Sequence, residues 1–147
     1  TVKGTKLYLK TNKRIANFCP GFVKEPGDLS SPPDIESNIA PIENKSNGVI
    51  VVDGSVTSKN IGLLKTPLIL TIRNGKIIEI TSKDNKNKNF LNKILGELNS
   101  KKRILGELGF GLNPKAKLCG SMLIDEGVLG SVHFGFGSNF TFGGKNK

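Results

Sequence analysis

Hydrophobic and polar positions along the chain predict a strand-rich fold with one clear helix. Residues 67–72 and 76–80 are two apolar runs joined by Asn74-Gly75, a pair that favours a type I′ hairpin turn. Residues 48–54 form a β-branched block bounded by glycines, which is typical of a strand buried on both faces. We therefore expect a central strand at 48–54 and a hairpin after it.

Apolar residues recur at helical spacing in residues 84–99, where Asp84 or Asn85 can cap the first turn. Shorter patterns predict further elements: a β-ribbon of residues 4–10 and 14–18, a strand at 104–110, a short helix within 115–126 and a strand at 128–136. Together these elements predict an α+β fold, with a β-rich mixed sheet or partial barrel and one or two helices.

Residues 19–41 interrupt this pattern. They hold five prolines and little periodicity, so we expect a loop over the whole segment. The 147 residues are 36% apolar, which is enough for one domain spanning residues 1–147. Because the chain opens on Thr1 without an initiating Met, we expect it to be a fragment of a larger protein.

The net charge of +10 raises the question of a polyanion partner. Nineteen of the 22 basic residues are Lys, and they are spread along the chain, whereas direct reading of nucleic-acid bases favours Arg. We therefore expect no specific nucleic acid, and the short apolar runs predict no membrane partner.

Cys19 and Cys119 stand alone, which favours a cytoplasmic protein without a disulfide framework. Abundant Lys and the absence of Gln are typical of a thermophile.

Candidate chemistry centres on His133, the one histidine of the chain. On a strand its side chain points to the face opposite Val132 and Phe134, either to solvent, as for an ordinary surface histidine, or into a cavity. Glu107 has small and apolar neighbours, and Glu36 precedes another apolar stretch. Each alone is typical of a solvated carboxylate. Together the three supply the oxygen and nitrogen ligands used by zinc, cobalt or manganese sites.

Residues 106–116, Gly-Glu-Leu-Gly-Phe-Gly-Leu-Asn-Pro-Lys-Ala, and residues 125–137, Asp-Glu-Gly-Val-Leu-Gly-Ser-Val-His-Phe-Gly-Phe-Gly, carry a resemblance. Segments 33–41 and 47–55 agree with it in the same order. Over almost its whole length the chain resembles the thermophilic aminopeptidase T family of metallopeptidases, including its leucyl aminopeptidase-like branch. The resemblance implies a β-rich catalytic-type domain that binds two divalent metal ions and removes N-terminal residues from peptides.

The resemblance also implies a ligand set. Glu36 and Glu107 correspond to glutamate ligands of the family, and His133 corresponds to its first histidine ligand. Either glutamate could also accept a proton from a metal-bound water, which makes both candidate catalytic residues. Glu97 stands in a similar Ile-Leu-Gly-Glu-Leu segment, but only Glu107 is followed by the Gly-x-Gly-x-Asn-Pro run.

Two further positions are candidate substrate-binding residues. Asn113 and the backbone around it could line the substrate cleft. Phe140 stands where the peptidases have a tyrosine, so a hydroxyl that could contact metal or substrate is missing. The family's downstream His-x-Asp pair does not occur before Lys147. The resemblance therefore supports a metal-binding domain more strongly than peptidase activity of this chain.

The leading expectation is a metal-dependent aminopeptidase-like hydrolase with a peptide substrate and zinc, cobalt or manganese as cofactor. Relatives are commonly dimers, so we expect a homodimer. One alternative is a mononuclear iron dioxygenase of the same superfamily that opens hydroxylated pyridine rings, which the missing tyrosine favours. Another alternative is a non-catalytic domain that binds a polyanion through its lysines.

Overall fold

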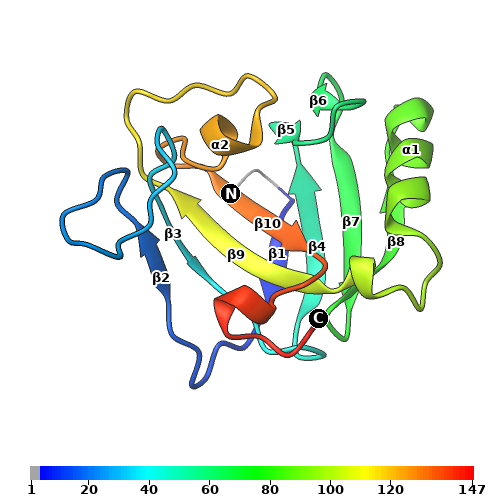
Figure 1. Ribbon diagram of the computed structural model, residues 1–147. Helices are drawn as coiled ribbons and strands as arrows, with labels where there is room; N and C mark the ends of the chain where they lie inside the picture. The colour runs from blue at the N-terminus through cyan, green and yellow to red at the C-terminus, as the bar shows by residue number, and fades with distance from the viewer. Residues whose placement is uncertain (1–3) are drawn as a thin grey trace.

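The computed structural model describes residues 4–147, which form two four-stranded antiparallel sheets and a two-stranded ribbon (Figure 1). The strands are β1 (Lys6–Tyr8), β2 (Asn17–Cys19), β3 (Glu36–Ile39), β4 (Asn47–Val52), β5 (Ser55–Val56), β6 (Gly62–Leu63), β7 (Leu68–Arg73), β8 (Lys76–Thr81), β9 (Leu105–Gly111) and β10 (Val132–Phe136). The helices are α1 (Asn85–Leu95) and α2 (Met122–Asp125), with 3-10 turns η1 (Lys101–Arg103) and η2 (Phe140–Phe142). The predicted α+β fold is confirmed.

The first sheet has the order β1-β4-β7-β8. Its β7–β8 hairpin confirms the predicted turn, since Asn74 has φ 48° and Gly75 has φ 72°, as a type I′ turn requires. β4 lies between β1 and β7, which confirms a central strand. The prediction that both faces of this strand are buried is wrong. Ile50 points into the core, whereas Val49 and Val51 are only half-buried on the outer face.

The second sheet has the order β10-β9-β3-β2, so the predicted ribbon of residues 4–10 and 14–18 is wrong. β1 pairs with β4 and β2 pairs with β3, which places the two strands in different sheets. The link between them is longer than the two-residue turn that closes a tight hairpin.

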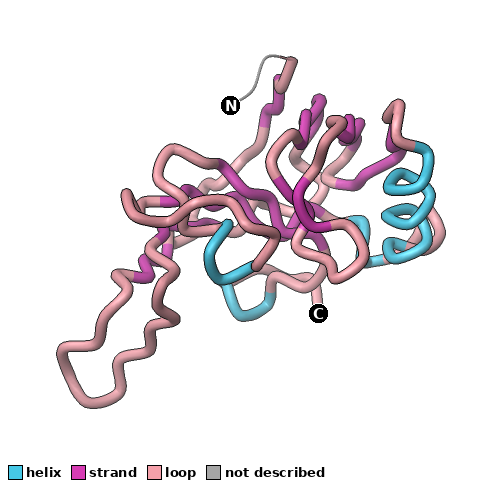
Figure 2. The backbone as a smooth tube through the Cα atoms, turned by 90° about the horizontal axis from the view of Figure 1, so that it is seen from above, coloured by secondary structure: helices cyan, strands magenta, loops and turns pink. Residues whose placement is uncertain are grey.

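The predicted loop over residues 19–41 is interrupted by β3, a strand hidden in the sequence because Glu36 and Asn38 are polar yet buried. The remaining loop between β2 and β3 projects far from the body of the molecule (Figure 2).

Helix α1 is capped as predicted, because the Asn87 amide donates to Asp84 Oδ1 at 3.0 Å. The helix ends at Leu95 rather than near residue 99, since Gly96 has φ 70° and leaves the helical path. The strand expected at 104–110 is β9, the short helix expected within 115–126 is α2, and the strand expected at 128–136 is β10, which is shorter than predicted.

The two sheets are joined at the hairpin turn, where the Leu105 amide donates to the Gly75 carbonyl at 2.8 Å. The core lies between the inner face of the first sheet, α1 and β10. Its members are the buried side chains Ile50, Leu68, Leu70, Ile72, Ile77, Ile80 and Leu95, with Phe134 and Phe136 packed against them. Phe134 packs against the core on one face of the second sheet. Neighbouring side chains of a strand alternate between faces, so the preceding residue, His133, points to the opposite face, as predicted.

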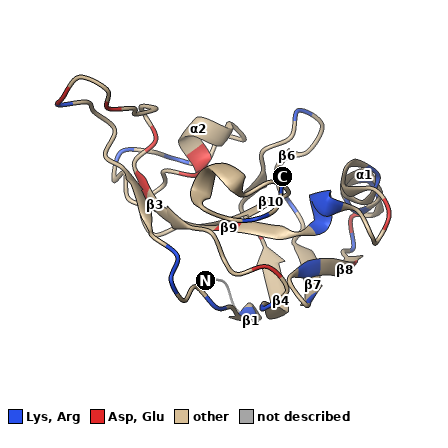
Figure 3. Cartoon of the chain, turned by 60° about the horizontal axis from the view of Figure 1, so that its bottom comes forward, with Lys and Arg blue, Asp and Glu red and all other residues tan. Residues whose placement is uncertain are grey.

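Lys and Arg lie on segments spread over the molecule and do not form one stripe (Figure 3). Cys19 and Cys119 are free thiols. Within residues 4–147, no helix is long and apolar enough to cross a bilayer.

Candidate metal centre

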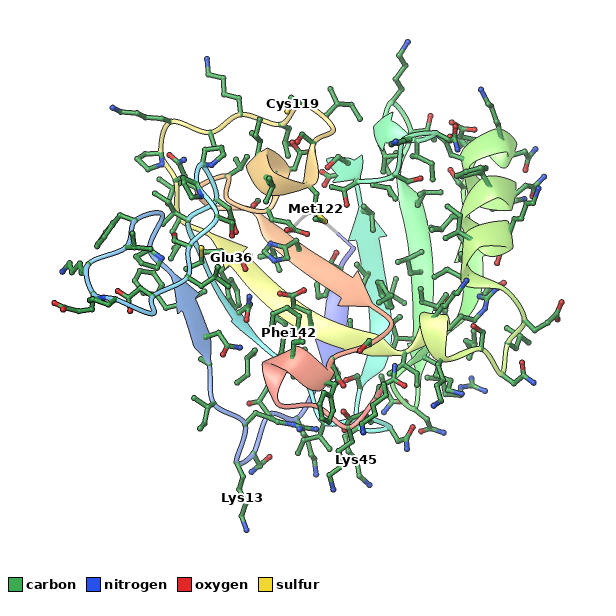
Figure 4. All side chains as sticks on the ribbon, viewed as in Figure 1. Lys13, Glu36, Lys45, Cys119, Met122 and Phe142 are labelled. Carbon is green, nitrogen blue, oxygen red and sulfur yellow. The ribbon has the colours of Figure 1, made fainter. Side chains whose placement is uncertain are left out.

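Three neighbouring strands bring the predicted ligands together. In the register of the second sheet, Gly135 of β10 lies opposite Glu107 of β9, and Glu36 of β3 lies opposite Gly111 of β9. His133 Nε2 lies 2.9 Å from Glu36 Oε2 and 4.0 Å from Glu107 Oε1. One ligand atom from each of the three side chains lies within 4.8 Å of the others. Figure 4 shows Glu36 over the sheet formed by β9 and β10.

Glycines on the same face make room for these side chains. A Cβ at position 109 would lie 1.9 Å from His133 Nε2, so the imidazole occupies the space that any other residue would fill. A Cβ at position 135 would lie 2.7 Å from Glu107 Oε2. The glycine-rich sequence of β9 and β10 is therefore a geometric requirement of the cluster.

Unpartnered polar atoms show that a metal ion fits this cluster. Glu36 Oε2 and both ring nitrogens of His133 are buried and have no hydrogen-bond partner. Glu36 Oε2 lies 2.9 Å from His133 Nε2, so the two unpartnered atoms are close enough to bind the same ion. The Asn38 amide donates to Glu36 Oε1 at 2.6 Å and orients the carboxylate, as second ligand shells commonly do.

The three side chains are only 9–15% exposed, and their pKa values reflect this burial. Burial acts to raise the pKa of Glu36, but His133 and the Asn38 amide outweigh it and hold the pKa below its usual value. Burial acts to lower the pKa of His133, but the adjacent Glu36 outweighs it and raises the pKa. Burial raises the pKa of Glu107, which the positive charge on His133 opposes. A divalent cation would favour the ionised form of both carboxylates and the neutral imidazole.

Two more carboxyl groups interact electrostatically with this cluster and were not predicted from the sequence. Burial and the charge of Glu36 raise the pKa of Asp34 to about 6, although His133 opposes the rise. Burial raises the pKa of Glu126 to about 7, with His133 again opposing and Glu107 adding to the rise. Asp34 stands two residues before Glu36, and Glu126 follows Asp125 in the segment of residues 125–137 that carries the resemblance.

The other sequence candidates lie outside the ligand cluster. The side-chain Nδ2 of Asn113 donates to the Pro33 carbonyl at 2.8 Å, and its Oδ1 accepts from the backbone N–H of Lys115 at 2.9 Å. These bonds fix the loop before β3. Phe140 lies in η2 with its ring 4.6 Å from Lys147 Nζ, and more than half of it is exposed. Their substrate-binding roles stay predictions. Glu97 follows α1 and is exposed, so the structure brings Glu107 rather than its twin to the cluster.

Fold and site thus define an α+β domain with a candidate centre for one metal ion. A sequence model described as 2,5-dihydroxypyridine 5,6-dioxygenase matches residues 1–147. The chain belongs to this dioxygenase family. The resemblance to aminopeptidase T is supported only as a likeness of fold, and the family model assigns the chain to the dioxygenases instead. No curated protein matches the chain significantly.

Solved structures share the fold at low sequence identity. The 2,5-dihydroxypyridine dioxygenase of Pseudomonas putida KT2440 superposes with a TM-score of 0.75 at 19% identity, over 95% of this chain and 45% of the other. Wild-type AmpT, an aminopeptidase T, from Thermus thermophilus superposes with a TM-score of 0.68 at 18% identity, over 90% of this chain and 34% of the other. The chain therefore spans less than half the length of either protein.

Proposed function

We propose that this chain forms the metal-binding part of a ring-opening dioxygenase that acts on a hydroxylated pyridine or a related ring. The observation that carries the proposal is the convergence of Glu36, Glu107 and His133 on one point, in a chain that the dioxygenase family matches along its whole length. The reaction would insert both atoms of O₂ into the ring and break one ring bond, so that no other oxidant or leaving group is required.

A single ion, and iron rather than zinc, cobalt or manganese, is the cofactor that this function implies. Glu36, Glu107 and His133 would hold it through two carboxylates and one imidazole. This donor set differs from the two-histidine, one-carboxylate triad of many non-haem iron oxygenases, but it uses the same ligand types. Bound ferrous iron would supply the one-electron chemistry that lets O₂ react with the ring.

The protein groups around the ligands have roles of their own in this proposal. The Asn38 amide keeps Glu36 turned towards His133. The two ligand carboxylates balance the charge of a divalent ion, and their burial restricts the access of water to it. Asp34 and Glu126, whose pKa values are raised to about 6 and about 7, can each hold or release a proton near neutral pH.

The aminopeptidase is the second candidate. The observation that favours it is the presence of two glutamates beside one histidine, a mixture that zinc hydrolases also use. The family match favours the dioxygenase, and Phe140 lacks the hydroxyl that the peptidase resemblance implies.

The test compares both activities on the same protein. After anaerobic loading with Fe²⁺, O₂ uptake with 2,5-dihydroxypyridine would be followed with an oxygen electrode, and after loading with Zn²⁺, Co²⁺ or Mn²⁺, release of nitroaniline from leucine p-nitroanilide would be measured. We expect substrate-dependent O₂ uptake that Glu107→Gln abolishes and Glu97→Gln preserves. Anilide hydrolysis without O₂ uptake would contradict the dioxygenase proposal and support the peptidase.

A further inference from the structure

A partly open cavity of about 520 Å³ lies between the two sheets, on the side of β10 that faces the core. Ile50, Leu70 and Ile77 of the first sheet line it, and Phe134 and Phe136 of β10 line it from the other side. Well-packed interiors contain few voids larger than a water molecule, and apolar walls hold water poorly. A space of this size and chemistry is typical of a pocket for an organic ligand.

The cavity reaches the candidate metal centre at one end. His133, a member of the ligand cluster, lines the cavity, and so does Glu126, whose pKa responds to His133. β10 is the terminal strand of its sheet, and no other described strand pairs with that edge. An occupant of the cavity could therefore approach the metal centre without unfolding either sheet.

Three carboxylates line the cavity, and Glu126 is the half-buried one without a hydrogen-bond partner among the described residues, whereas Asp53 is exposed to solvent. The neighbouring Asp125 is engaged, since its two oxygens accept from the Cys119 and Gly120 amides at 2.8 and 2.9 Å. The segment that carries Glu126 is fixed by the backbone N–H of Asn113, which donates to the Gly127 carbonyl at 2.7 Å. No hydrogen bond from or to the Glu126 side chain occurs among the described residues, so its oxygens can accept one from a ligand.

We propose that this cavity binds a hydroxylated aromatic compound larger than a single ring, with a ring hydroxyl donating to Glu126 and the apolar part lying between the sheets. An engineered cavity of about 150 Å³ holds benzene. The volume here is more than three times larger, which leaves room for a fused second ring or an apolar substituent. The inference rests on the proposed function only in naming such a compound as the substrate.

The test measures binding to the metal-free chain of residues 1–147, with fluorescence for naphthols and calorimetry for phenol. We expect 2-naphthol to bind at least about 10-fold more tightly than phenol, because its second ring buries additional apolar surface. At a pH about two units above the pKa of Glu126, where its carboxylate is ionised, Glu126→Gln should weaken 2-naphthol binding by about 5- to 10-fold, since a charge-assisted hydrogen bond becomes a neutral one. The same variant should leave naphthalene binding within about twofold, as should the control Glu97→Gln for both probes.

A second pair of variants locates the bound probe. Leu70→Phe adds volume to the cavity, whereas Ile69→Phe places the same ring on the outer face of β7, where Ile69 is already 39% exposed. We expect only Leu70→Phe to reduce 2-naphthol binding, by about 10-fold or more. If its circular dichroism shows that it does not fold, Val52→Phe replaces it, because Val52 also lines the cavity and is less buried.

The outcomes separate this inference from the proposed function. Equal affinities for phenol and 2-naphthol, or no effect of the cavity variants on binding, would overturn the inference even if the iron-loaded protein consumed O₂. Probe binding that responds to Glu126→Gln and the cavity variants, in a protein with no O₂ uptake, would support the binding site and reject the dioxygenase.

Discussion

The imidazole of His133 lies over Gly109, its partner across the β9–β10 pair, so closely that a Cβ at position 109 would be 1.9 Å from Nε2. The pairing of His133 with a glycine therefore leaves the space above position 109 that the imidazole occupies. Because Gly109 has an extended backbone that other residues adopt without strain, its role lies in this close contact and not in the turn chemistry of glycine.

Gly109→Ala should displace the imidazole and weaken metal binding on the order of 100-fold, the upper range for losing correct ligand orientation. The measurement is calorimetric titration of Mn²⁺ or anaerobic Fe²⁺ into the metal-free protein. Gly54→Ala is the matched control, since a Cβ there would meet only the flexible end of Leu118 at 3.1 Å. Unchanged affinity in Gly109→Ala would show that the histidine does not bind the ion from this position.

Without metal, the protein should lose stability as the pH rises from about 5 to about 8. The pKa values of Asp34 and Glu126 are raised in the folded state to about 6 and about 7, so the folded protein binds more protons than the unfolded chain in this window. The raised pKa of His133 acts in the same direction, because its stabilising charge is lost as the pH rises through the folded value.

Scanning calorimetry in the presence of a chelator measures this loss as a fall in Tm. For a chain of this size, each kcal/mol lost from the free energy of unfolding lowers Tm by roughly 2–4 °C. Glu126→Gln and Asp34→Asn should each flatten the dependence on pH. Saturating Mn²⁺ should remove it, because a cation favours the ionised carboxylates. A Tm that rises over the same range without metal would contradict the assigned directions of these pKa shifts.

Arg103 is 4% exposed and connects the end of α1 to the first sheet. Its guanidinium donates to the carbonyls of Gly96, Glu97 and Ile77 and to Asn92 Oδ1. Arg103→Met should lower the free energy of unfolding by about 2–4 kcal/mol, because the buried side chain loses four hydrogen bonds, of which the one to the Ile77 carbonyl is buried and the others are partly buried.

Denaturant unfolding measures the effect of this change. Arg73→Met, on an exposed position of β7, should stay within about 0.5 kcal/mol of the unchanged protein. A similar loss from both substitutions would show that the buried hydrogen bonds of Arg103 do not account for its effect.

Local sequence signals predicted the parts of the fold that depend on neighbouring residues. The Asn74-Gly75 turn and the Asp84 cap are confirmed because turn and cap chemistry act within a few residues. The partners of β1 and β2 were wrong, since pairing between distant strands leaves no local pattern. β3 was missed because a strand that points Glu36 and Asn38 towards a polar cluster lacks the usual apolar alternation.

The candidate site divides in a similar way. Glu36, Glu107 and His133 were predicted through the resemblance, and the strand register explains why they meet. Asp34 and Glu126 were not predicted, because their proximity to the cluster depends on how the loops before β3 and before β10 fold back over the sheet. The cavity is lined by residues of both sheets, so no single segment of the sequence indicates it.

The most direct test of the account is the stoichiometry and ligand dependence of metal binding. Anaerobic titration of the metal-free protein with Fe²⁺ should give one ion per chain, and X-ray absorption should show one nitrogen and carboxylate oxygens around it. Glu107→Gln, Glu36→Gln and His133→Ala should each reduce the affinity at least about 100-fold, while Glu97→Gln leaves it unchanged. Binding that persists in all three variants, or that falls equally in Glu97→Gln and Glu107→Gln, would contradict a metal centre at this cluster.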